Sequence, residues 1–62
     1  MIPEDYRARR AKLLSEYNNL MRLRLYRSAA ARVRQIAQLD YDYDGTDPNK
    51  TKAVFHYDQL IK

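Results

Sequence analysis

The 62-residue sequence has no cysteine and no tryptophan, one glycine and two prolines. Without cysteine it can form neither a disulfide nor a zinc site with thiolate ligands. With one glycine it cannot build a glycine-rich phosphate loop. A chain this short buries only about 60% of its unfolded surface. We therefore expect its extra stability to come from a partner, most simply a second copy in a homodimer.

Long apolar runs are also missing. No stretch approaches the roughly 20 apolar residues of a membrane span, and the first residues, MIPEDY, lack the apolar centre of a signal peptide. The sequence thus predicts a cytoplasmic protein that does not associate with membranes. At this length we expect one domain, residues 1–62.

Charge is unevenly distributed along the chain. Residues 1–38 carry nine arginines and lysines against three acidic residues, a net charge of +6, whereas residues 39–62 carry three lysines against five aspartates, a net charge of −2. The basic part is rich in arginine, whose planar guanidinium group suits phosphates and carboxylates. This part predicts an acidic partner such as DNA or RNA.

Residues 4–38 contain neither glycine nor proline and are rich in good helix formers. At about 100° per residue, the apolar side chains of the first half share one helix face: Tyr6, Leu13, Tyr17, Leu20 and Met21. Those of the second half share another: Leu25, Tyr26, Ala29, Val33 and Ile36. The face changes near Asn18 and Asn19, which are poor helix formers. We expect a helical hairpin with helices at 4–17 and 20–38, the alternative being one long helix whose halves face different partners.

The acidic stretch that follows resembles the start of a calcium loop. Asp40, Asp42, Asp44 and the glycine after them match the first half of an EF-hand. The glutamate that closes such a loop is replaced by Thr51. We therefore expect no metal site, and nothing else in the sequence indicates a cofactor.

Alternation of apolar and polar residues favours strands in the same stretch. Antiparallel pairing sets Tyr41 opposite Phe55 and Asp44 opposite Lys52, so apolar meets apolar and acid meets base. The predicted fold is α+β: helical at 4–38, with a β-hairpin at 39–57 and a short tail at 58–62. The alternative is an all-α, three-helix fold, in which Asp47 caps a helix that begins at Pro48.

Residues able to perform catalysis do not form a pattern. The sequence has a single histidine, His56, and its two serines, Ser15 and Ser28, fall within the helical region. Aspartates on a strand surface would have no apolar pocket to adjust their pKa values. We expect a protein that is not an enzyme.

The most suggestive surface lies on the second predicted helix, opposite its apolar face. Guanidinium groups can bind phosphates there, and amides can contact base edges. We expect a small, arginine-rich nucleic-acid-binding or regulatory protein. The predicted contacts are Arg24, Arg27, Arg32, Arg34 and Gln38, supported by Arg7 and Arg10.

The alternative function is protein interaction through the acidic and aromatic edge of the predicted hairpin. Tyrosine is favoured at interfaces, and aspartates complement a basic partner. The protein would then be an adaptor, an inhibitor or an assembly component, and small phage or mobile-element proteins often have this size and composition. The predicted contacts are Asp40, Tyr41, Asp42, Tyr43 and Asp44.

Overall fold

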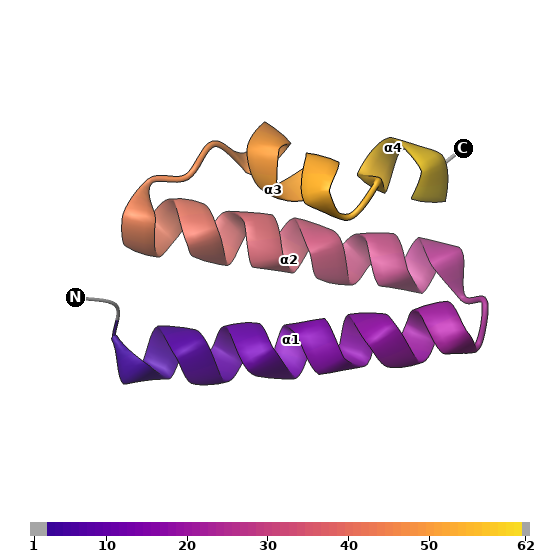
Figure 1. Ribbon diagram of the computed structural model, residues 1–62, viewed down its shortest axis with the longest axis horizontal. Coiled ribbons are helices and arrows are strands. Elements are labelled where there is room, and N and C mark those ends of the chain that lie inside the picture. Colours follow the sequence, from indigo (N-terminus) through magenta and orange to yellow (C-terminus); the bar gives the residue numbers. More distant parts are fainter. Residues whose placement is uncertain (1–2, 62) are drawn as a thin grey trace.

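The computed structural model describes residues 3–61, which form four helices. The helices α1 (Glu4–Arg22) and α2 (Tyr26–Asp44) have 19 residues each and run antiparallel (Figure 1). The short helices α3 (Pro48–Val54) and α4 (Tyr57–Leu60) follow and form a layer over α2. Since α1 covers the other side of α2, the second helix lies in the middle of an elongated bundle.

The predicted α+β fold is wrong. Residues 3–61 contain no strand, and the stretch predicted as a β-hairpin, 39–57, completes α2 and forms α3. The predicted tail overlaps α4. The arrangement is the all-α alternative, a bundle in which α1, α2 and α3 pack side by side.

Local capping explains why residues 44–48 end one helix and start another. Gly45 adopts the left-handed conformation (φ 73°), and its N–H donates to the carbonyl of Tyr41 at 3.1 Å. Glycine is the usual residue at this position after a helix, because it has no Cβ to clash. Asp47 then accepts a hydrogen bond from the N–H of Asn49 at 2.9 Å, and Pro48 occupies the first helical position. These signals prevail over the alternation that favoured strands.

The antiparallel pair of helices turns at residues 23–25, not at Asn18 and Asn19. Arg24 adopts a left-handed conformation (φ 61°). The N–H of Leu25 donates to the carbonyl of Leu20 at 2.8 Å, and the N–H of Arg24 donates to that of Met21 at 3.1 Å. This hydrogen-bond pattern is a Schellman motif, which satisfies the last carbonyls of a helix. The two asparagines are tolerated because they are exposed in the last turns of α1.

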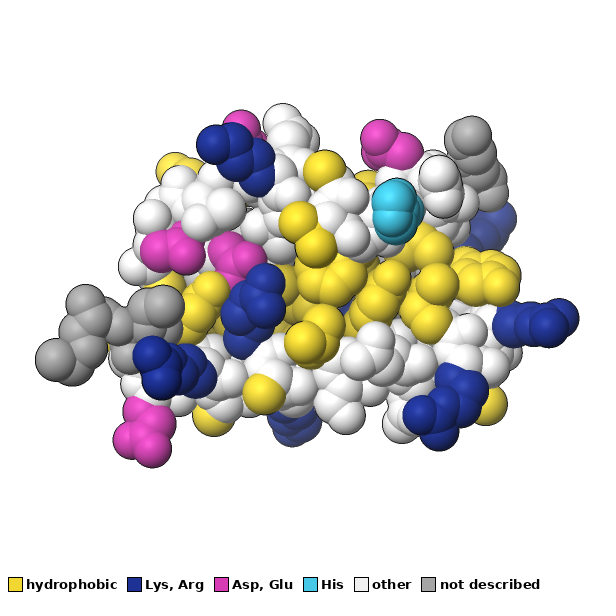
Figure 2. All heavy atoms as spheres, in the orientation of Figure 1, with side chains coloured by type: hydrophobic (Ala, Val, Ile, Leu, Met, Phe, Trp, Pro, Cys, Tyr) yellow, Lys and Arg dark blue, Asp and Glu magenta, His cyan; other side chains and the backbone are white. Residues whose placement is uncertain are grey.

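The core follows the inner face of α2. Val33 and Ile36 are fully buried there, and Phe55 and Tyr57 cover them from the α3–α4 layer. From α1, the ring of Tyr17 packs edge-on against Phe55 with 5.0 Å between ring centroids. Figure 2 shows a band of hydrophobic side chains on one face of the molecule, between α1 and the α3–α4 layer.

Among residues 3–61, no helix combines the length and the apolarity needed to cross a bilayer.

Candidate functional site

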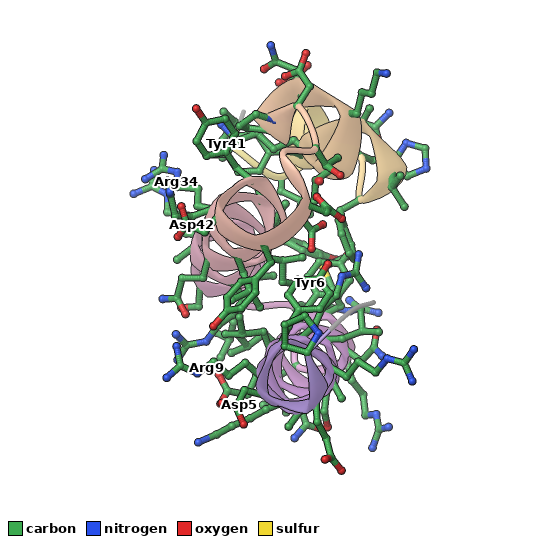
Figure 3. All side chains as sticks on the ribbon, turned by 90° about the vertical axis from the view of Figure 1, so that its left-hand side faces the viewer. Asp5, Tyr6, Arg9, Arg34, Tyr41 and Asp42 are labelled. Carbon is green, nitrogen blue, oxygen red and sulfur yellow. The ribbon has the colours of Figure 1, made fainter. Side chains whose placement is uncertain are left out.

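Two arginines, an alanine and a glutamine lie on the exposed face of α2, beside the α3–α4 layer. Arg27, Ala31, Arg34 and Gln38 recur at helical spacing and are exposed. Figure 3 shows Arg34 pointing outward from α2 on the same side as Asp42. Arg24 precedes α2, in the turn that follows α1. The predicted stripe therefore consists of a helical part and one turn residue.

Two neighbouring hollows lie where α2 meets α4 and Ile61. One, of about 300 Å³, is lined by Arg27, Ala30, Ala31, Arg34 and Ile61. The other, of about 440 Å³, is lined by Arg24, Leu25, Tyr26, Arg27, Ser28, Gln59 and Leu60. Arg27 lines both hollows, Arg34 lines the first and Arg24 lines the second. We call these two neighbouring hollows the arginine hollows.

Within residues 3–61, the arginines of the hollows have no ion pair with an acidic side chain. Arg34 donates from Nε to the hydroxyl of Tyr57, and its guanidinium carbon lies 5.8 Å from the centre of that ring. Both contacts are to a neutral group. Within residues 3–61, neither Arg24 nor Arg27 has an acidic side chain within 4.0 Å. The hollows are therefore a concentration of positive charge.

Two other predicted contacts have intramolecular partners. Arg32 faces α1, where its Nε lies 2.7 Å from a carboxylate oxygen of Glu16. Gln38 donates to the carboxylate of Asp42 at 2.8 Å on the exposed face. Arg32 thus joins α1 to α2 rather than lining the hollows, whereas Gln38 remains on the outer face.

The N-terminal arginines lie far from the hollows. Arg7 and Arg10 are in the first two turns of α1, and Figure 1 places this end of the bundle opposite the turn between α1 and α2. Arg7 is exposed. Arg10 donates from Nε to Asp40 at 3.0 Å. The structure therefore does not bring these two residues together with Arg24, Arg27 and Arg34.

Asp40 is the centre of a buried polar network that joins three helices. Tyr6 of α1 donates its hydroxyl proton to one carboxylate oxygen, and Thr51 of α3 donates to the other at 3.0 Å. Arg10 reaches both oxygens, at 3.0 and 3.4 Å. We call Tyr6, Arg10, Asp40 and Thr51 the Asp40 network.

The network shifts the pKa values of its members. Desolvation raises the pKa of Asp40, but hydrogen bonds from Arg10, Tyr6 and Thr51 outweigh it, and the pKa lies below its ordinary value. Burial, followed by the hydrogen bond to Asp40, raises the pKa of Tyr6. The carboxyl group is thus held ionised, with donors to both oxygens.

The acidic and aromatic edge predicted at residues 40–44 does not exist. These residues form the last turn of α2, where successive side chains point about 100° apart. Asp40 is buried, and the ring of Tyr43 lies 5.2 Å from that of Tyr6. Tyr41 and Asp42 point outward (Figure 3), and Asp44 accepts from the N–H of Thr46. A partner strand therefore has no edge to pair with at this segment.

Helical geometry also separates the three aspartates that resembled a calcium loop. Asp42 is exposed, about 200° around the helix from the buried Asp40. Within residues 3–61, no three acidic, histidine or cysteine side chains are grouped so that they could hold a metal ion.

Several residues of the site were not predicted from the sequence. Tyr26 had been assigned to the apolar face, but it lines the hollows and is 45% exposed. Leu60 and Ile61 line the hollows, and their positions three and four residues after Tyr57 are a helical spacing that could have indicated them. The partnership of Arg10 with Asp40 spans 30 residues, and no local pattern indicates it.

Comparison with protein-family models, with curated proteins and with solved structures finds no match to this chain. The geometry and charge of the site are therefore the basis for assigning a function.

Proposed function

We propose that the protein binds nucleic acid, DNA or RNA, through the arginine hollows and the outer face of α2, without catalysing a reaction. The observation that carries this proposal is that Arg24, Arg27 and Arg34 line two hollows sharing Arg27, without an acidic partner in residues 3–61. Uncompensated guanidinium groups attract a polyanion and release its counterions on binding.

The proposal gives the arginines and the glutamine of this surface different roles. Arg24, Arg27 and Arg34 pair with phosphates, and Gln38 contributes an amide that can hydrogen-bond a base or a sugar. Arg10 and Arg32 are left out because carboxylates of the chain already hold them. The proposal places this binding in the cytoplasm, where a nucleic acid is within reach.

A homodimer remains part of the proposal because the monomer exposes much surface. Its accessible area is 4837 Å², roughly 600 Å² more than is usual for a monomer of this mass. Standard interfaces bury about 800 Å² on each partner. The apolar band of Figure 2 suits such a contact with a second copy. A mass twice that of the chain in sedimentation equilibrium is the expected result, and a monomer at every concentration contradicts it.

Titration of labelled oligonucleotides tests the nucleic-acid proposal. Fluorescence anisotropy is measured at about 50 and about 200 mM salt, with DNA and RNA. Replacement of Arg24 and Arg27 by alanine is expected to weaken binding. It should also make the negative slope of log K against log salt shallower by about two, one for each lost phosphate contact.

The matched control changes two cations of α1. Arg9 and Lys12 are exposed and have no acidic partner within residues 3–61. Arg9→Ala with Lys12→Ala removes the same charge and is expected to leave most of the affinity. An equal loss in both double variants, or none in the first, contradicts the assigned surface.

A further inference from the structure

The arginine hollows combine two kinds of surface. Apolar residues line them, Leu25, Tyr26 and Leu60 in one hollow and Ala30, Ala31 and Ile61 in the other, together with the arginines and, in the former, Ser28 and Gln59. Their volumes, about 300 and 440 Å³, reach the lower end of the range of small-molecule pockets. A purely phosphate-binding surface needs no such apolar residues.

An unpaired nucleotide matches this combination. Its base has a flat face that stacks on aromatic side chains, and its phosphates lie beside that base. In a duplex, the faces of the bases are stacked on one another and are not accessible. The exposed ring of Tyr26 sits between Arg24 and Arg27 in the sequence and lines the same hollow as both.

The charge along α2 also disfavours a duplex. The helix is about 28 Å long, with arginines in its first half and Asp40, Asp42 and Asp44 at its end. Asp42 points outward on the same side as Arg34 (Figure 3). A duplex laid along the helix would bring its phosphates close to this carboxylate, whereas a flexible strand can contact the first half alone.

We infer that the arginine hollows bind unpaired nucleotides of a single-stranded nucleic acid, with a base stacked on Tyr26 and the adjoining phosphates held by Arg24, Arg27 and Arg34. The inference rests on the proposed function and narrows its substrate class. Single-stranded DNA and single-stranded RNA present the same base faces and phosphates.

Binding of short labelled oligonucleotides tests the inference. The probes are oligo-dT, oligo-U and a DNA duplex of equal length, with affinities measured by anisotropy at low salt. We expect one or both single strands to bind more tightly than the duplex. The comparison of oligo-dT with oligo-U shows which sugar is preferred.

Three tyrosine variants locate the stacking. Tyr26→Leu keeps an apolar side chain but removes the ring, and roughly tenfold weaker single-strand binding is expected. Tyr26→Phe retains the ring and should retain the affinity. Tyr41→Leu is the control, because Tyr41 is also an exposed residue of α2 but lies outside the hollows. Far-ultraviolet circular dichroism verifies that each variant is folded.

The possible outcomes separate this inference from the proposed function. Single-strand preference together with loss only in Tyr26→Leu supports it. Two results would overturn the inference but leave nucleic-acid binding standing. One is that the duplex binds as tightly as the single strands or more tightly. The other is that folded Tyr26→Leu binds normally while the Arg24 and Arg27 double variant binds more weakly. Absence of binding to every probe overturns both.

Discussion

The two ends of the bundle use arginine in opposite ways. At the end where α1 begins, Arg10 binds the buried carboxylate of Asp40, whose other hydrogen bonds come from Tyr6 and Thr51. At the end where α1 turns into α2, Arg24 and Arg27 border open hollows and, within residues 3–61, have no acidic partner. The first arrangement holds three helices together, and the second leaves positive charge available to a ligand.

The difference teaches that abundance of arginine alone does not define a binding surface. Arg10 and Arg27 have the same side chain, and both lie on helices of the same length. What separates them is the nearest acid: the carboxylate of Asp40 for one, and none within residues 3–61 for the other. Stability should therefore respond to changes at one end, and ligand affinity to changes at the other.

Removing the carboxylate of Asp40 should have the largest effect on stability. Asp40→Ala leaves the hydroxyl of Tyr6 buried without an acceptor, and Arg10 loses its ion pair. We expect a loss of about 3 kcal/mol in the free energy of unfolding, most of what a core of this size supplies. Urea denaturation followed by circular dichroism measures it.

The matched control for this prediction is Asp42→Ala, on the same helix. Asp42 is exposed and accepts only from Gln38, so its loss should change the free energy of unfolding by no more than about 0.5 kcal/mol. Equal stability of the two variants would show that the Asp40 network does not hold the helices together.

The same network predicts that stability falls at both extremes of pH. Because the pKa of Asp40 is lowered in the fold, its contribution is present above the unfolded pKa, about 3.9, and is lost as pH falls below that value. The pKa of Tyr6 is raised, so its contribution is present below about pH 10 and is lost as pH rises above that.

Urea denaturation across the pH range measures both effects. Asp40→Asn should flatten the acid limb of the stability curve, and Tyr6→Phe should flatten the alkaline limb. An acid limb that is unchanged in Asp40→Asn would assign the acid sensitivity to other carboxylates.

The smallest expected change in stability comes from glycine substitutions at two strained backbone positions. Arg24 and His56 both have a left-handed backbone, with φ 61° and 53°, which strains a residue with a side chain. Replacing either by glycine should raise the free energy of unfolding by about 0.5–1 kcal/mol.

Only one of these two glycine variants should alter affinity. Arg24 lines the hollows and His56 does not. Arg24→Gly is therefore expected to weaken oligonucleotide binding while stabilising the protein, whereas His56→Gly stabilises it without weakening binding. Thermal melts and anisotropy measure the two properties, and equal affinity of the two variants would remove Arg24 from the proposed surface.

The helical part of the fold was predictable up to the point where a charge enters the core. The inner face of α2 includes Val33, Ile36 and Ala37, and the position four residues after Ile36 and three after Ala37 on that face is Asp40. Because a carboxylate occupies a position where helical spacing requires an apolar residue, the pattern stops there in the sequence. The alternation that follows then favoured a strand. The partners Tyr6, Arg10 and Thr51, all distant in sequence, make an aspartate acceptable at this position.

The candidate site was predictable only where it depends on spacing along one helix, and not where it depends on packing between helices. The spacing of Arg27, Arg34 and Gln38 depends only on helical geometry, so it follows from the sequence. The hollows need Leu60 and Ile61 to return against α2, and this depends on the turns that start α3 and α4. Asp47 and Pro48 indicate the first of these turns, but the alternation of apolar and polar residues in 39–57 favours a β-hairpin instead.

The short turns between helices have a consequence for how the chain folds. Three residues join α1 to α2 and α2 to α3, and two join α3 to α4, so much of the packing is between segments close in sequence. Chains of this kind lose little loop entropy before gaining contacts, and they fold in microseconds to milliseconds. We therefore expect the pair of long helices to form first and to act as a template on which the last fifteen or so residues condense.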